Sequence, residues 1–215
     1  TMVSYELPTG WNWFSINVKD ENLNNPVALL ESIKQSVVSV LGQEEDLVYD
    51  DQYGLYGSLT AFKPDRGYKV RVKEDVDFSL KGIPFAENEV TITLNKGWNW
   101  MGYTPNMEMS VNAALCNLMA EEGDIVMAQD QFATYDGAAW KGSLSVLAPG
   151  NAYLYYSGSV KSFNYPTGSS KMAIPMLSYR ASESYYFAKW QYDKKENLIE
   201  VTELPYTTTI EAIID

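Results

Sequence analysis

The chain has 215 residues, of which 46% are hydrophobic and 20% are charged, a composition typical of a globular protein. Its net charge of −12 argues against a nucleic-acid-binding protein, which needs a basic face to neutralise phosphates. The sequence contains no histidine, so Ser/His/Asp and Cys/His nucleophile schemes and most zinc sites are excluded. It also contains no stretch of about 18 apolar residues, the length expected of a membrane span.

An internal repeat organises the chain. The Gly-Trp-Asn-Trp motif at residues 10–13 recurs at residues 97–100, 87 positions later. A second set of matches recurs 85 positions later and pairs Gly57, Ser58, Leu59, Pro64 and Tyr68 with Gly142, Ser143, Leu144, Pro149 and Tyr153. Between these sets, Asp51 aligns with Asp130, which predicts a shorter helical region and a longer hairpin tip in the second copy. We therefore expect two repeat domains, at residues 1–86 and 87–166.

The first copy begins with a predicted strand from Gly10 to Val18, in which both faces are apolar. Such a strand is expected to be central, with Trp11 and Trp13 in the core. Asn25 as N-cap and Pro26 at the first helical position then predict a helix that continues to Gly42. Short aromatic and β-branched runs at residues 47–49, 67–72 and 78–83 are typical of antiparallel strands.

The second copy follows the same order. Trp98 and Trp100 are expected in the core, and Ser110 is expected to begin a helix over residues 111–119. Three strands follow, at residues 125–128, 152–156 and 160–165, with Asp136 and Gly137 at a tight hairpin connection.

These elements predict an α+β fold. Each repeat is expected to be a mainly antiparallel β-sheet, a meander, with one α-helix. Residues 167–171 have the composition of a linker. Residues 172–215 are expected to form a C-terminal β-rich segment of unclear type, either a separate small element or the beginning of a truncated domain.

The repeated motifs resemble a known family. The runs LPTGWNWFSINV (Leu7–Val18), LNKGWNWMGY (Leu94–Tyr103) and QDQFATYDGAAWKGSLSVLAPGNAYLYY (Gln129–Tyr156) are similar to the Gly-Trp-Asn-Trp tandem repeat of secreted and surface proteins of Bacteroides-like bacteria. The first copy departs from the pattern at Tyr53–Tyr56, where the hairpin tip is shorter and lacks the tryptophan. The resemblance implies an extracellular or cell-surface, non-enzymatic module.

The hairpin tip of the second copy supplies the candidate ligand-binding residues, Trp140, Tyr135 and Asp136. The first copy lacks this tip, so the fold does not require it. A tryptophan beside an Asp-Gly turn could stack on a sugar or anchor a protein partner. The alternative is that the indole folds back over its own sheet and covers the core.

Other constellations favour structural interpretations. The two Trp-Asn-Trp strands could form a sugar-stacking platform, but core packing is the favoured interpretation. The carboxylate clusters at residues 44–46 and 50–51, and at Asp193 with Glu196, are interpreted as solvated surface rather than a glycosidase pair. We expect no catalytic residues, no metal site and no cofactor.

The sequence therefore predicts a non-catalytic extracellular binding or adhesion module, a monomer, whose partner is a glycan or an extracellular protein. One alternative is a structural spacer that holds other domains apart. A second is a carboxylate-dependent glycoside hydrolase.

Overall fold

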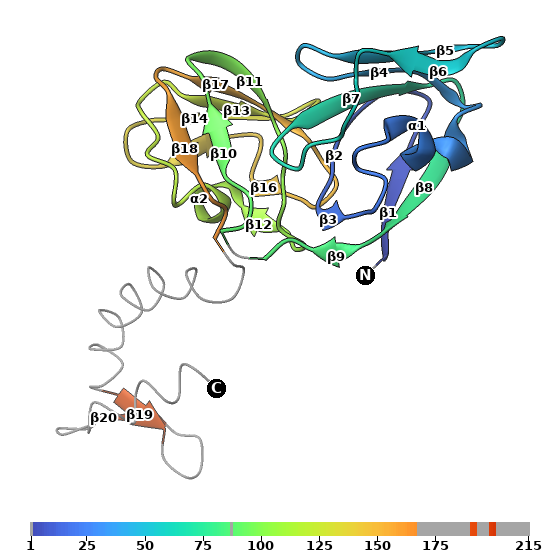
Figure 1. Ribbon diagram of the computed structural model, residues 1–215. Helices are drawn as coiled ribbons and strands as arrows, with labels where there is room; N and C mark the ends of the chain where they lie inside the picture. The colour runs from blue at the N-terminus through green and yellow to red at the C-terminus, as the bar shows by residue number, and fades with distance from the viewer. Residues whose placement is uncertain (1, 87, 167–189, 193–197, 201–215) are drawn as a thin grey trace. The chain divides into compact units, whose positions relative to one another are not determined.

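The computed structural model describes residues 2–86 and 88–166, together with two short strands near the C-terminus (Figure 1). The chain divides into two units, residues 1–167 and 168–215. In the second unit, β19 (Trp190–Tyr192) pairs antiparallel with β20 (Leu198–Glu200). The remainder of the predicted linker and C-terminal segment lies outside the described residues.

The two copies of the repeat lie in the first unit. The elements of copy 1 are β1 (Met2–Leu7), β2 (Gly10–Ser15), β3 (Val18–Lys19), α1 (Pro26–Leu29), the 3-10 helix η1 (Glu31–Ile33), β4 (Val37–Leu41), β5 (Asp46–Asp50), β6 (Gly54–Gly57), β7 (Gly67–Val72), β8 (Val76–Lys81) and β9 (Ile83–Pro84). Those of copy 2 are β10 (Ile92–Leu94), β11 (Gly97–Met101), β12 (Met109–Ser110), α2 (Val111–Ala114), β13 (Ile125–Met127), β14 (Phe132–Tyr135), β15 (Trp140–Gly142), β16 (Val146–Leu147), β17 (Tyr153–Ser157) and β18 (Lys161–Phe163).

Both copies are built around a five-stranded antiparallel sheet with the same topology. The strand order is β2-β7-β4-β5-β6 in copy 1 and β11-β17-β13-β14-β15 in copy 2. In both sheets the Trp-Asn-Trp strand is therefore an edge strand. A smaller ribbon, β1 with β8 or β10 with β18, covers the inner face of each sheet together with the short helix (Figure 1).

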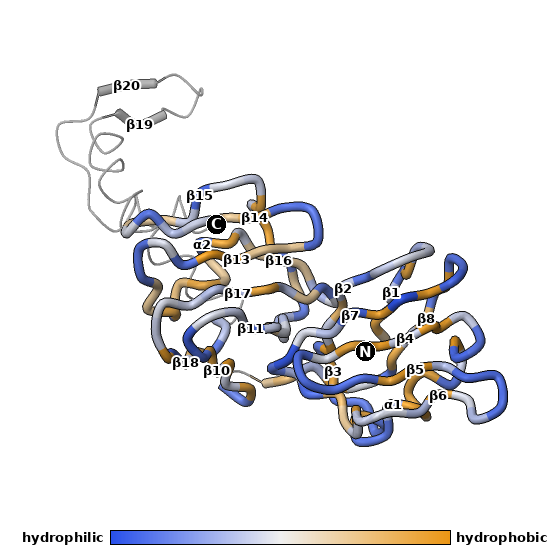
Figure 2. Tube along the Cα trace, turned by 90° about the horizontal axis from the view of Figure 1, so that it is seen from above, coloured by the Kyte–Doolittle hydropathy of each residue, from blue (hydrophilic) through white to orange (hydrophobic). Residues whose placement is uncertain are grey.

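Each copy has a hydrophobic core of its own, because side chains alternate between the two faces of each strand. In β7, Tyr68, Val70 and Val72 are buried, while Lys69 and Arg71 between them point to the outer face. The hydropathy colouring shows these apolar strand positions running through both sheets (Figure 2).

The α+β prediction was wrong, since strands make up 45% and helices only 7% of the structure. Asn25 does cap a helix, as its side chain accepts a hydrogen bond from the Ala28 amide at 3.1 Å. That helix ends at Leu29, however, and Val37–Leu41 forms strand β4. Valines at 37, 38 and 40 favour an extended backbone, and this preference outweighs the helical spacing of the leucines before them.

The second predicted helix is also shorter than expected. Ser110 caps α2, accepting from the Ala113 amide at 3.3 Å, but α2 ends at Ala114 rather than Met119. Leu115 and Leu118 are nevertheless buried, as the apolar pattern predicted. The pattern thus identified the core positions correctly and the backbone conformation incorrectly.

The tryptophan core assignment was wrong as well. Trp11 is 40% exposed and Trp98 is 45% exposed, and Trp13 and Trp100 are only half-buried. The motif residue that is buried between the two tryptophans is the asparagine, Asn12 or Asn99, whose side-chain amide donates to the turn that precedes the strand. Asn12 Nδ2 lies 2.7 Å from the Pro8 carbonyl oxygen, and Asn99 Nδ2 lies 2.8 Å from that of Asn95.

The aligned aspartates, Asp51 and Asp130, are not structurally equivalent. In copy 1 the turn after β4 closes with a hydrogen bond from the Gly42 amide to the Glu45 carbonyl, and in copy 2 the same turn joins Ala128 to Gln131. Equivalent residues of this turn are therefore 86 positions apart, close to the 87 of the Gly-Trp-Asn-Trp motif. The predicted shortening of the region before this turn in copy 2 is not present.

A seam of reciprocal hydrogen bonds joins the two copies along their edge strands. The Ser15 amide donates to the Gly150 carbonyl at 2.9 Å, and at the equivalent place in the other copy the Gly102 amide donates to the Asp65 carbonyl at 3.2 Å. The side chains of Gln43 and Gln129 add a second matched pair. Gln43 donates to the Trp98 carbonyl and accepts from the Trp100 amide, while Gln129 donates to the Trp11 carbonyl.

The seam satisfies backbone groups that would otherwise be left open at two sheet edges. Unpaired edges invite association with other chains, so their mutual coverage favours a single arrangement of the copies. Close approach requires glycine at two positions of the seam, Gly67 and Gly102. A Cβ atom on Gly102 would lie 2.2 Å from the Pro64 carbonyl oxygen and 2.8 Å from that of Arg66.

We expect Gly102→Ala to destabilise the first unit by about 1 to 3 kcal/mol, because backbone on both sides of the seam would have to separate. Gly42→Ala is the matched control, since the added Cβ would meet its nearest neighbour, the Glu45 carbonyl oxygen, at 3.4 Å. Urea unfolding followed by far-UV circular dichroism measures both. Equal stability of the two variants would contradict a tightly packed seam.

Candidate ligand-binding surface

The residues predicted to bind a ligand instead pack and form hydrogen bonds within copy 2. Trp140 is 7% exposed and its indole packs between the rings of Tyr135 and Tyr155, with centroids 5.3 and 5.7 Å away. The Asn112 side chain binds the backbone of Trp140 twice, accepting from the Trp140 amide at 2.8 Å and donating to the Trp140 carbonyl at 3.3 Å. The structure matches the alternative in which the indole covers the core.

Asp136 shapes the hairpin tip. Its carboxylate accepts from the amides of Ala138 and Ala139 at 3.0 and 2.9 Å and forms an ion pair with Lys141. The Lys141 ammonium and the two amides lower the pKa of Asp136 well below its usual range. All of its contacts lie within the hairpin, so we do not assign Trp140, Tyr135 or Asp136 to the candidate site.

The exposed aromatic side chains gather on the outer faces of the two five-stranded sheets. In copy 1 one row crosses all five strands, as the strand register shows, and consists of Trp11, Arg71, Ser39, Val48 and Tyr56. Strands in a sheet lie about 5 Å apart, so this row is about 19 Å long. It has an exposed aromatic ring at each end.

Copy 2 carries the equivalent row with different chemistry. It consists of Trp98, Tyr156, Ile125, Thr134 and Lys141. Trp98 packs edge-to-face against Tyr156, with centroids 5.4 Å apart. Trp98 and Trp11 are the equivalent residues of the two copies, and both leave a large part of the indole exposed.

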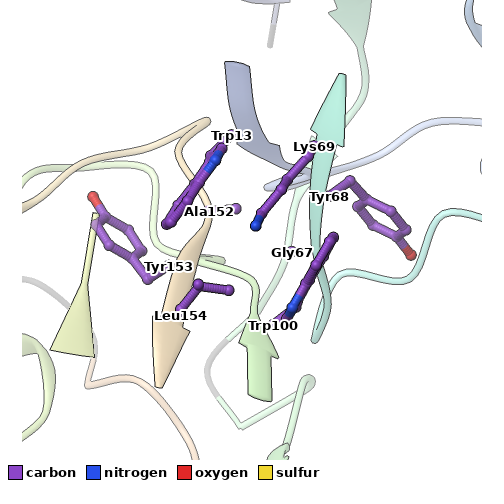
Figure 3. Close-up of a pocket in the computed structure, with 8 residues that line it drawn as sticks. All are labelled: Trp13, Gly67, Tyr68, Lys69, Trp100, Ala152, Tyr153 and Leu154. Carbon is purple, nitrogen blue, oxygen red and sulfur yellow. The ribbon is translucent and has the colours of Figure 1, made fainter. Parts of the chain in front are cut away.

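The outer faces meet at the seam, where Lys69 lies between two indoles (Figure 3). The Lys69 ammonium is 4.5 Å from the ring centroid of Trp13 and 4.2 Å from that of Trp100. A cation over two indole faces is stabilised by the negative potential of each ring. Burial lowers the pKa of the Lys69 ammonium.

A shallow recess, too small to enclose a water molecule, surrounds this contact. Its lining residues come from both copies and are Trp13, Gly67, Tyr68, Lys69, Trp100, Ala152, Tyr153 and Leu154 (Figure 3). We name the exposed and half-buried side chains around it, Trp11, Trp13, Lys69, Trp98, Trp100 and Tyr156, the tryptophan surface. The seam fixes the two halves of the tryptophan surface relative to each other. Each half lies on an edge strand, β2 or β11, and each of these strands is hydrogen-bonded to the other copy.

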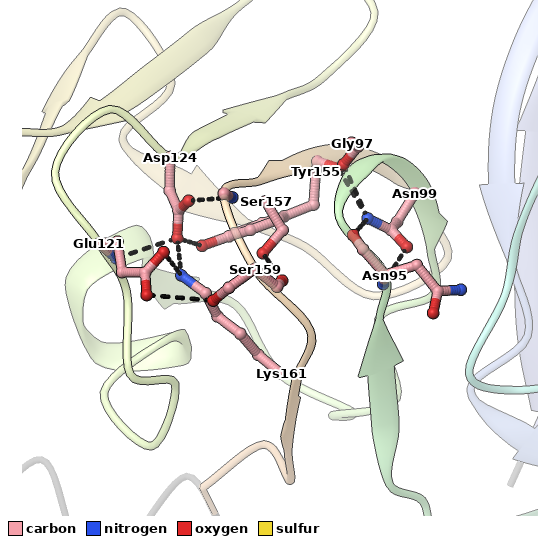
Figure 4. Close-up of polar contacts among 10 residues, drawn as sticks. Asn95, Gly97, Asn99, Glu121, Asp124, Tyr155, Ser157, Ser159 and Lys161 are labelled. Atoms are coloured by element: carbon pink, nitrogen blue, oxygen red, sulfur yellow. Dashed lines mark hydrogen bonds and ion pairs between the residues drawn. The ribbon is translucent and has the colours of Figure 1, made fainter.

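Copy 2 also contains a buried charged cluster that sequence reasoning missed (Figure 4). The Asp124 side chain is 1% exposed and that of Lys161 6% exposed, and the two form an ion pair. The Asp124 carboxylate also accepts from the Tyr155 hydroxyl at 2.7 Å, the Gly158 amide at 2.9 Å and the Glu121 amide at 3.0 Å.

This cluster is structural. Burial alone would raise the pKa of Asp124, but the hydrogen bonds from Lys161, the two amides and Tyr155 outweigh it and lower the pKa. With four donors around it, the carboxylate has no free position for a substrate. In copy 1 the strand register places Val70 and Val76 where copy 2 has Tyr155 and Lys161, so the repeat folds with or without the charges.

Two carboxylates from the acidic clusters of copy 1 make local hydrogen bonds. Asp50 caps the β5–β6 turn, accepting from the amides of Gln52 and Tyr53, and Asp46 accepts from the Ser58 hydroxyl. Asp193 and Glu196 lie outside the described residues. Within residues 2–86 and 88–166, no three acidic or cysteine side chains come together as metal ligands would.

Comparison with known proteins adds no functional assignment. No protein-family model matches the chain, and neither a curated protein nor a solved structure matches it. In the part of the chain that the structure describes, none of the helices has the length and apolar character of a membrane span.

We expect Trp140→Ala to lower the free energy of unfolding by about 3 to 5 kcal/mol, the usual range for removing a buried aromatic side chain. Trp98→Ala, at an exposed indole, should cost about 1 kcal/mol or less. Urea unfolding of the two variants gives the comparison directly. A larger loss for Trp98→Ala than for Trp140→Ala would contradict the assignment of the core and the surface.

The Asp124 cluster should make stability depend on pH. Since the folded pKa of Asp124 is lower than its unfolded value near 4, its contribution is present above pH 4 and is lost as the pH falls through the folded pKa. We expect Asp124→Asn to cost about 3 to 5 kcal/mol at pH 7, because the buried Lys161 loses its buried partner and keeps only the exposed Glu121 at 3.5 Å.

The difference in stability between this variant and the wild type should shrink between pH 4 and pH 2. Urea unfolding at pH 7, 4 and 2.5 measures it, with Asp77→Asn, at an exposed aspartate of β8, as control. A difference that stays the same at all three pH values would exclude a charged Asp124 as its source.

Proposed function

We propose that the two repeats form a non-catalytic glycan-binding module and that the tryptophan surface is its binding site. The observation that carries this proposal is the exposure of Trp11 and Trp98 at equivalent positions of the two copies. Exposing an indole forgoes the free energy of burying it, about 25 cal/mol for each Å². Large apolar side chains exposed together on one surface are typical of interaction sites.

The chemistry of the two rows favours a glycan over a protein partner. Each row combines hydrogen-bonding side chains, Arg71 and Ser39 in one row and Thr134 and Lys141 in the other, with aromatic and aliphatic ones. Indole faces carry a negative potential that attracts the C–H groups of a sugar ring, and the polar side chains can bind its hydroxyls. The buried core of a protein interface, in contrast, is depleted of charged residues.

The proposal includes a location at the bacterial cell surface or outside the cell and a monomeric module. Its support is the resemblance of the Gly-Trp-Asn-Trp motifs to repeats of secreted and surface proteins. The −12 charge further favours partners other than nucleic acid.

A structural spacer is the second candidate function. The reciprocal hydrogen bonds of the seam favour it, because they hold the two copies in one arrangement. A spacer would need the seam but not the exposed indoles.

A glycan array followed by isothermal titration calorimetry separates the two functions. We expect the wild type to bind at least one glycan, and Trp11→Ala and Trp98→Ala each to weaken binding at least tenfold while the melting temperature changes by only a few degrees. Ile83→Ala is the matched control, at an exposed apolar side chain of β9, outside the five-stranded sheets. Absence of any reproducible glycan binding by the wild type would favour the spacer.

A further inference from the structure

Strand β7 carries a row of positive charges across the outer face of copy 1. Lys69 and Arg71 point to the same face, about 7 Å apart along the strand, and the exposed Lys73 follows directly after the strand ends. The equivalent strand of copy 2, β17, carries Leu154 and Tyr156 at the positions of Lys69 and Arg71. The positive row is therefore a property of copy 1 and not of the repeat.

These charges have no carboxylate partner among the described residues. Ion pairs within residues 2–86 and 88–166 involve Lys19, Lys34, Arg66, Lys141 and Lys161. Two acidic side chains near this strand, Glu74 and Asp46, each accept a hydrogen bond from a serine hydroxyl, of Ser36 and Ser58 respectively, and form no ion pair with the row. Unneutralised cations stand out in a chain with a net charge of −12.

The strand register sets Arg71 directly beside an exposed indole. Arg71 is paired with Trp11 across the β2–β7 ladder, so the two side chains lie next to each other on the outer face. A sugar ring stacked on Trp11 would present its substituents to the guanidinium. Arginine binds a carboxylate with two parallel hydrogen bonds, a geometry that neutral hydroxyls do not match.

We propose that copy 1 recognises an acidic glycan, a polysaccharide that contains uronic acid, with its sugar ring on Trp11 and its carboxylate on Arg71. Lys73 extends the positive row along the same strand and Lys69 continues it toward the seam. This inference rests on the proposed glycan-binding function and names its ligand class. Copy 2, with Tyr156 in place of Arg71, supplies stacking without charge selection.

The test uses matched ligands that differ only in charge, namely oligogalacturonates and oligoglucuronates together with their methyl esters. We expect the free acids to bind at least tenfold more tightly than the esters, with affinity falling as salt rises from 50 to 500 mM. Arg71→Gln should remove this preference for the free acid over the ester, and Arg71→Lys should restore it in part. Lys81→Gln, at an exposed lysine of β8, is the control for the loss of one charge.

The outcomes distinguish the two proposals. Equal binding of acid and ester, binding of neutral array glycans only, or an unchanged preference in Arg71→Gln would overturn the inference while leaving glycan binding intact. Absence of binding to any glycan would overturn the proposed function with it. Binding of a single-stranded DNA oligonucleotide as tightly as the free acids would show that the positive row selects charge and not a sugar.

Discussion

The structure depends on the mutual pairing of two sheet edges. The Trp-Asn-Trp strand ends the five-stranded sheet in both copies, and its outward amides and carbonyls would be unpaired in an isolated repeat. In the tandem, the loop before β7 pairs with one edge and the loop before β17 pairs with the other. Each copy thus completes the backbone hydrogen bonding of its neighbour, and this pairing brings the indoles of Trp13 and Trp100 to Lys69.

The repeated motifs therefore serve assembly and also carry the exposed indoles of the tryptophan surface. The Pro64 and Pro149 segments supply the seam acceptors at Asp65 and Gly150, and the repeated Tyr68 and Tyr153 fix these segments with their hydroxyls. The two copies carry different side chains at several equivalent strand positions. Lys69 and Arg71 of copy 1 occupy the positions of Leu154 and Tyr156 in copy 2. Valines of copy 1 occupy the positions of Tyr155 and Lys161, which contact Asp124 in copy 2. Selection among glycans is expected at Arg71, which is specific to copy 1 and lies beside the repeated Trp11.

Much of the local structure could be predicted from the sequence. The repeat itself, both helix caps and the buried positions Leu30, Ile33, Leu115 and Leu118 follow from motif spacing and apolar pattern. Helix length could not be predicted in this way, because the apolar spacing of residues 30–41 fits a helix while Val37, Val38 and Val40 prefer a strand. Local preference decided the conformation there, and the predicted α+β class failed with it.

The candidate site was harder to predict for a physical reason. A strand with two apolar faces is expected at the centre of a sheet, yet here the edge position leaves Trp11 and Trp98 exposed. Strand order is set by pairing between distant segments, which single-sequence patterns do not encode. The same limit hid the contact between Trp140 and Tyr155, on strands that are not neighbours in the sheet, which helps to bury the indole. Asp124 and Lys161, 37 residues apart in the chain, meet only through the sheet.

The most direct test of this structure is amide hydrogen exchange at the seam. The amides of Ser15, Trp100, Gly102 and Ala152 each donate to an acceptor in the other copy. If reciprocal edge pairing holds the copies together, these four amides should exchange as slowly as the core amides of β7 and β17. Exchange at the rate of the exposed hairpin amides, with β7 and β17 still protected, would show that the copies are not joined in this way.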